Sequence, residues 1–248
     1  MDFTISKFSD FLHALASMST YQLLHDVDAR PEYALRVARL EREAGVMAKF
    51  YFRTMHFDSH AEIISAIFTM GHEVGYHYES LTTTNGDVEA AYKDFCINLD
   101  RLRKLVPVAT ACAHGSPRSP WNSQDIWKQY DIHALGIDYE PMLDTDFSKT
   151  LYLTDTGRRW DGYKVSVRDK VPQYQDLWQR EGFVFHSTDD IIRVLQDPEH
   201  PIHQKELLIN THPQRWMPFG MGWMKEAVLQ NTKNIVKRII INLKPNNH

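Results

Sequence analysis

Short apolar runs alternate with amphipathic stretches along most of the chain, and this alternation restricts the fold more than any other feature. The clear runs lie at 21–24, 46–52, 73–77, 108–113, 151–154 and 206–210, and weaker ones at 165–167 and 183–185. Apolar residues at helical spacing occupy 3–16, 31–44, 61–70, 87–105, 123–130, 191–195 and 223–243. Short strands separated by helices predict parallel pairing through helical crossovers.

About seven such units predict an α/β fold with a closed or nearly closed β/α barrel. The alternative is an open doubly wound sheet. No Gly-x-Gly-x-x-Gly segment follows the first strand, so a dinucleotide site has no support. The 248 residues suit one domain, with a core over about 20–215 and a C-terminal helix at 223–243.

Composition narrows the function classes. The net charge of −4 gives no electrostatic reason to expect a nucleic-acid partner. No apolar run is long enough to span a bilayer, and the N-terminus lacks the pattern of a secretory signal, so we expect a cytoplasmic protein. Cys96 and Cys112 form no metal-type pair and are expected to be buried, inert thiols. The sequence does not indicate an oligomeric state.

Two aspartates close the first predicted strand. Asp26 and Asp28 are two residues apart, and side chains at that spacing in a strand point the same way. Neighbouring carboxylates repel unless a proton, a cation or a metal lies between them. The pair therefore marks either the edge of a metal site or an ordinary pair of loop aspartates.

Other ionisable residues end other predicted strands: His77, His114, Asp155 and His212. In a β/α barrel the C-terminal strand ends gather at one mouth, where chemistry occurs. Considered alone, each of these residues is better explained as an ordinary core or surface residue than as a catalytic or metal-binding one. Two histidines and one carboxylate on a divalent metal leave a position for water, with a free carboxylate as base and a histidine as acid. Such a set suits hydrolysis of an amide or ester.

The segments 25–28, His-Asp-Val-Asp, and 71–77, Gly-His-Glu-Val-Gly-Tyr-His, resemble two motifs of the NodB-type polysaccharide deacetylases. The segment 208–212 is similar to their late Leu-x-His motif, and Asp155 with Trp160 resembles the region before it. Order and spacing agree over about 20–215. The resemblance implies a distorted β/α barrel of about seven parallel strands and a divalent metal, most readily zinc.

The resemblance also implies roles for individual residues. Asp26 would be the catalytic base, Asp28 and His77 metal ligands, and His212 the catalytic acid. Asp155 and Trp160 would belong to the substrate-binding region.

The chain departs from the family pattern at two places. Leu81 stands where the family has its second metal histidine, and Ala-His-Gly-Ser-Pro at 113–117 replaces the expected Arg-x-Pro segment. We expect His114 to supply the third ligand, with Glu79 or His72 as alternatives. Arg118 is a candidate for the role of the missing arginine. The segments most resemble a subgroup found in surface-polysaccharide gene clusters.

Three further interpretations remain beside this one. Trp121 and Trp160 suit either sugar stacking or ordinary packing. The His25-Asp26 doublet occurs in HD-type phosphohydrolases, but there it lies on a helix and here it closes a strand. Cys112 and His114 are close enough on one strand for a thiol hydrolase pair, although a core cysteine is the simpler reading.

These features predict a metal-dependent hydrolase that removes an N-acyl group, acetyl or formyl, from an amino sugar used in surface-polysaccharide or lipopolysaccharide synthesis. A nucleotide-linked sugar is one option, because no export signal is present. The alternatives are a non-catalytic sugar-binding or scaffold protein on the same fold, and a metal-free C–N hydrolase acting on a ring amide.

Overall fold

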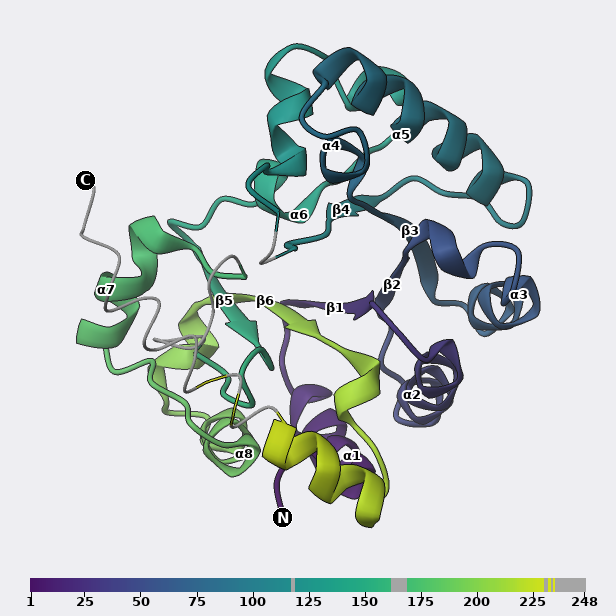
Figure 1. Ribbon diagram of the computed structural model, residues 1–248. Coiled ribbons are helices and arrows are strands. Elements are labelled where there is room, and N and C mark those ends of the chain that lie inside the picture. Colours follow the sequence, from purple (N-terminus) through teal and green to yellow (C-terminus); the bar gives the residue numbers. More distant parts are fainter. Residues whose placement is uncertain (117–118, 162–168, 230–231, 233, 235–248) are drawn as a thin grey trace.

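The computed structural model describes residues 1–116, 119–161, 169–229, 232 and 234. Within these ranges six strands form one parallel sheet in the order β4-β3-β2-β1-β6-β5. The strands are β1 (Tyr21–Val27), β2 (Lys49–Phe52), β3 (Glu73–Tyr78), β4 (Ala111–Ala113), β5 (Thr150–Thr154) and β6 (Glu206–Thr211). Figure 1 shows this sheet curling through the middle of the molecule, with the helices arranged around it.

Five α-helices lie in predicted intervals, the interval 123–130 holds a 3-10 turn, and the short helices at 80–83, 141–144 and 172–180 were not predicted. The α-helices are α1 (Ile5–Leu15), α2 (Pro31–Glu43), α3 (Ala61–Thr69), α4 (Ser80–Thr83), α5 (Val88–Arg103), α6 (Pro141–Asp144), α7 (Pro172–Arg180) and α8 (Thr188–Gln196). The 3-10 turns are η1 (Thr54–His56), η2 (Ser123–Lys128), η3 (His133–Leu135), η4 (Pro201–Gln204) and η5 (Pro213–Arg215). The C-terminal helix is described at 221–229, and most of its expected remainder lies outside the described residues. Among the described helices, none combines the length and apolarity needed to cross a membrane.

Helix starts show which local signals were decisive. Ser187 and Asp190 form a reciprocal capping box at α8, and the Asp87 carboxylate caps α5. The segment 59–62, Ser-His-Ala-Glu, has the sequence of a capping box, which predicts a cap at Ser59, but that capping box does not form. Its hydroxyl instead donates to the Met55 carbonyl, and His60 occupies the cap of α3. The 3-10 turn η1 fixes this segment before α3 begins, which removes Ser59 from the cap position.

The expected seven strands are six in the described chain. The run 165–167 lies outside the described residues, and 183–185 is irregular, with the Phe185 carbonyl accepting from the Trp160 amide at 3.0 Å. Beside β4, the irregular segment 138–140 stands where another strand would pair. The Ala111 amide donates to the Tyr139 carbonyl at 3.2 Å, and the buried Glu140 carboxylate accepts from the Ala113 amide at 3.1 Å. The sheet is therefore a curled half-barrel.

A buried tyrosine ring packs closely between β2 and β3. Tyr51 on β2 is fully buried, and its ring passes over Gly75 on β3. A Cβ at Gly75 would lie 2.4 Å from that ring, so only glycine fits there.

Candidate functional site

Three predicted ligands from the ends of β1, β3 and β4 converge on one point. Oδ1 of Asp28 lies 3.4 Å from Nε2 of His77 and 3.3 Å from Nε2 of His114. Around a tetrahedral cation with bonds of about 2.0–2.1 Å, neighbouring ligand atoms are about 3.3–3.4 Å apart. Both distances from Asp28 therefore match the separation that a zinc-like cation needs, and ligand atoms of the three residues all lie within 4.8 Å of one another.

The outer hydrogen bonds of the two histidines fix their tautomers. Nδ1 of His77 lies 3.0 Å from the Cys112 carbonyl, and Nδ1 of His114 lies 3.0 Å from Oε2 of Glu79. Because a carbonyl and an ionised carboxylate only accept, each Nδ1 carries a proton and donates. In the neutral rings, both Nε2 lone pairs then face the Asp28 carboxylate, an arrangement that is repulsive unless positive charge lies between them.

Three buried polar atoms at this point have no hydrogen-bond partner among the described residues: Asp26 Oδ1, Asp28 Oδ1 and His77 Nε2. Such atoms are costly to bury unpaired. Without a cation, protons supply the missing charge. Burial lowers the pKa of His77, but the charges of Asp26 and Asp28 outweigh it and raise that pKa to about 9. The donor set and its unpaired atoms therefore fit a divalent cation.

Glu79 lies behind His114 and orients it. Its second oxygen accepts from the Arg53 guanidinium, at 3.2 Å for Nε. The bond from His114 and the charge of Arg53 outweigh desolvation and lower the pKa of Glu79 to about 2, which keeps it ionised. Glu79 therefore contacts Nδ1, on the far side of the ring from Asp28, and does not occupy the third ligand position.

The other two positions considered for a second histidine also face away from the cleft. His72 is fully enclosed, with Nε2 donating to the Ala38 carbonyl at 2.9 Å and Nδ1 accepting from the Ala48 amide at 3.3 Å. Leu81 is 2% exposed and packs with Ala91 in a small apolar cluster beside α5. His114, which directly follows β4, is the histidine that completes the cleft group.

His212 faces this group from the end of β6. Its Nδ1 donates to Oδ1 of Asp155 at 2.7 Å, and its Nε2 lies 3.9 Å from both Asp26 Oδ2 and Asp28 Oδ2. Burial and Arg215 lower the pKa of His212, but Asp155 and Asp28 outweigh them and raise it above its ordinary value. His212 is therefore protonated more readily than a free histidine and aims Nε2 into the cleft.

Asp155 serves as the support of His212. It is fully buried and also accepts from the His212 amide at 2.9 Å, from Trp216 Nε1 at 3.0 Å and from Arg215. With all these donors around it, the carboxylate has no surface left for a ligand. The expected substrate contact of Asp155 is replaced by a positioning contact.

Asp26 lies between the two histidine groups. Its Oδ2 accepts from Nδ2 of Asn210 at 2.8 Å, and its Oδ1 is 3.9 Å from Nε2 of His77. That separation exceeds the 3.3–3.4 Å of the Asp28 group, so Asp26 stands beside the cation position and not within it. Its carboxylate remains available to accept a proton.

A cleft of about 490 Å³ opens above these residues. Its described lining includes polar groups that sequence reasoning missed, namely Asn210, Arg215, Asp169 and Lys170. Asp169 accepts from the hydroxyls of Tyr152, Thr154 and Thr156. Asn210 had a usable signal, because it lies two residues before His212 on one strand; Asp169 had none, because only the tertiary fold brings it to β5.

The expected tryptophan contacts with a sugar need correction, and the expected Arg118 contact stays a prediction. Trp160 is fully buried and packs on Phe11 at a ring-centre distance of 4.9 Å, so no face is open to a sugar. Trp121 packs over Gly86, where a Cβ would lie 2.2 Å from the indole nitrogen, and it is not among the described lining residues of the cleft. Arg118 lies outside the described residues.

Comparisons with known proteins give similarity only at the level of solved structures. No protein-family model matches the chain, and no curated protein matches it. A Streptococcus mutans CE4 esterase has 13% identity and a TM-score of 0.47, covering 95% of this chain and 88% of that one. A mutant of a CE4 family pseudoenzyme with restored enzymatic activity has 12% identity and a TM-score of 0.42, covering 89% of this chain. A mutant of the Bacillus subtilis peptidoglycan deacetylase PdaC has 12% identity and a TM-score of 0.41, covering 90% of this chain and 98% of that one.

The chain spans 64% of the length of the pseudoenzyme mutant. Similarity at this level assigns neither an activity nor a substrate to this chain.

Proposed function

We propose that this protein is a metal-dependent amide hydrolase that removes an N-acyl group from an amino sugar. One observation carries the proposal: the Nε2 atoms of His77 and His114 lie 3.4 Å and 3.3 Å from Asp28 Oδ1, with their protons committed to acceptors on the other side. Two histidines and one carboxylate at this spacing favour zinc. A cation held there polarises a carbonyl and makes water more acidic.

The remaining groups divide the proton transfers between them. Asp26, steadied by Asn210, accepts the proton of the water that attacks the acyl carbonyl. His212 stands on the other side of the cleft group and donates a proton to the departing amine nitrogen. Asp155 holds His212 in the tautomer that this transfer requires.

The substrate class comes from the motif resemblance, and the cleft is compatible with it. A volume of about 490 Å³ suits a small molecule of one or two sugar rings. Hydroxyl, amide and carboxylate groups on the wall, from Thr156, Asn210 and Asp169, suit the hydroxyls of a sugar. A precursor of a surface polysaccharide, free or nucleotide-linked, is the substrate we propose.

The experiment measures cation content and acyl release together. We expect about one zinc per chain in the purified protein, and release of acetate or formate from a panel of free and nucleotide-linked N-acyl amino sugars. Asp26→Asn should keep the cation and lose about 10²–10⁴-fold in turnover, the usual contribution of a general base. Cation binding without turnover on any of these sugars would favour a sugar-binding protein. Turnover that resists chelation would favour a metal-free hydrolase.

A further inference from the structure

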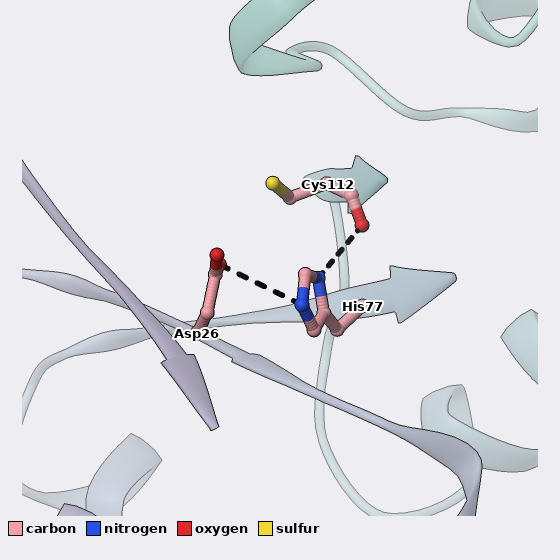
Figure 2. A group of neighbouring side chains, drawn as sticks. All are labelled: Asp26, His77 and Cys112. Atoms are coloured by element: carbon pink, nitrogen blue, oxygen red, sulfur yellow. Dashed lines mark hydrogen bonds and ion pairs between the residues drawn. The ribbon is translucent and has the colours of Figure 1, made fainter. Parts of the chain in front are cut away.

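A second group of potential ligands shares His77 with the cleft centre. Ligand atoms of Asp26, His77 and Cys112 lie within 4.8 Å of one another. Figure 2 shows the Asp26 carboxylate and the His77 ring pointing toward each other, with the Cys112 sulfur above the gap between them. Cys112 is opposite His77 in the β3–β4 register, which places both side chains on the cleft face.

The atoms of this group are free to bind. Asp26 Oδ1 and His77 Nε2 are buried without hydrogen-bond partners among the described residues. Among the described residues, the hydrogen-bond contact of the thiol is a long one, 3.9 Å to the Ala113 carbonyl. Cys112 is 6% exposed and lines the cleft, which gives an ion a route to it.

We propose that Asp26, His77 and Cys112 form an alternative site for soft, thiophilic cations such as Cd²⁺. The oxygen and nitrogen ligands of the Asp28 group are already at coordination spacing, so harder cations go there. The Asp26–His77 separation of 3.9 Å must shrink by a few tenths of an ångström, and a thiolate bond compensates soft cations for that movement. Coordination converts the thiol to a thiolate and releases one proton to solvent.

The two sites exclude each other, because Nε2 of His77 can bind only one cation. A soft cation at the Cys112 position also occupies the carboxylate of Asp26, which the proposed function uses as the base. Soft cations therefore inhibit the enzyme, because they take His77 from the catalytic cation and Asp26 from its role as base. This inference rests on the proposed function, since the two sites share His77.

The test titrates Cd²⁺ into the full chain and follows the ultraviolet charge-transfer absorbance of a Cd–thiolate bond. We expect a band that saturates at about one equivalent in the wild type, in His114→Ala and in Cys96→Ser, and no band in Cys112→Ser. Cys96, half-buried on α5, is the matched control for the other cysteine. Cys112→Ser should weaken Cd²⁺ binding at least about tenfold and leave the Zn²⁺ stoichiometry unchanged.

Other outcomes separate the two proposals. Cd²⁺ that binds without a thiolate band, and is lost in His114→Ala, overturns the alternative site and leaves the catalytic centre intact. A band that persists in Cys112→Ser also overturns it. Failure of both Zn²⁺ and Cd²⁺ to bind overturns both proposals. Should Cys112→Ser misfold, X-ray absorption of the Cd²⁺-loaded wild type decides, since the proposal requires one sulfur neighbour.

Discussion

Two histidine–carboxylate clusters occupy opposite faces of the same strands, and they differ in what their ring nitrogens contact. In the open cluster, at the cleft, His77 and His114 turn Nε2 toward Asp28, and in the neutral rings that nitrogen carries no proton. In the closed cluster, which is buried, both ring nitrogens of His25 have a partner. Nε2 lies 2.5 Å from Glu41 and Nδ1 lies 2.7 Å from Thr211.

The closed cluster lies next to the open one in sequence. His25 precedes Asp26 directly, and His72 belongs to the same segment as His77. His25 and Glu41 are fully buried, and Glu41 Oε2, which has no hydrogen-bond partner among the described residues, lies 3.8 Å from Nδ1 of His72. Residue type does not distinguish the clusters. The clusters differ in the face of the strand that each occupies and in the direction of the free lone pair. Strand alternation also places His25 and Asp26 on opposite faces, so they cannot bind one metal together as the doublet of an HD-type site does.

The largest effect is expected where the open cluster loses its shared ligand. His77→Ala should remove bound zinc and lower kcat/KM by at least about 10³-fold, because the Lewis-acid contribution of the cation is several kcal/mol. Elemental analysis and the acyl-release assay measure the two effects. A variant that retains stoichiometric zinc would show that the other residues, and not His77, define the centre.

A substitution in the closed cluster should lower stability and leave zinc binding unchanged. Glu41→Ala leaves His25 without its carboxylate in a fully buried position and should cost about 3–5 kcal/mol of unfolding free energy. Zinc content per folded chain should not change. Denaturant unfolding measures the loss, and Glu41→Gln, which keeps an acceptor, should cost less. Loss of zinc from folded Glu41→Ala would show that the two clusters are coupled.

The sequence predicted the parts of the site that topology alone brings together. Asp26, Asp28, His77, His114 and His212 each end a strand, and parallel strands deliver those ends to one edge. The structure places all of them around the cleft, while their chemical roles stay proposals. The alternation of side chains along a strand does not show which partner each side chain contacts. The hydrogen bond from His114 to Glu79 and the burial of Asp155 were therefore missed.

The fold shows the same limit. The apolar run at 183–185 has the composition of a strand, but its Phe183 amide bonds to the Trp178 carbonyl at the end of α7, and its Phe185 carbonyl to Trp160. Buried phenylalanines at alternate positions arise here from packing of an irregular segment. Apolar periodicity therefore identified burial correctly at this place, but it could not identify the hydrogen-bond ladder.

A smaller effect, on zinc affinity, is expected for Glu79, which orients the ligand His114 without binding the cation itself. Glu79→Gln keeps the shape but weakens the acceptor of His114, and loss of such a support typically costs 10–100-fold in metal affinity, about 1.4–2.7 kcal/mol. Competition with a zinc chelator measures it. Glu89→Gln, on the exposed surface of α5 beside Lys93, is the matched control and should leave the affinity unchanged. Equal affinity in both variants would leave His114 oriented by its backbone alone.

The smallest effect concerns protons in the closed cluster. Burial lowers the pKa of His72, and electrostatic interaction with His25 and Arg42 lowers it further, against the raising effects of Glu41 and the Ala38 carbonyl. With the folded pKa below the unfolded value near 6.5, the unfolded chain takes up the proton first as the pH falls. Stability should therefore decrease below about pH 6.5. His72→Gln should remove part of that decrease, measured as the unfolding free energy at pH 7.5 and pH 5.5. If His72→Gln left the change in unfolding free energy between the two pH values unaltered, the acid sensitivity would come from other residues. The closed cluster would then contribute nothing to the pH dependence of stability.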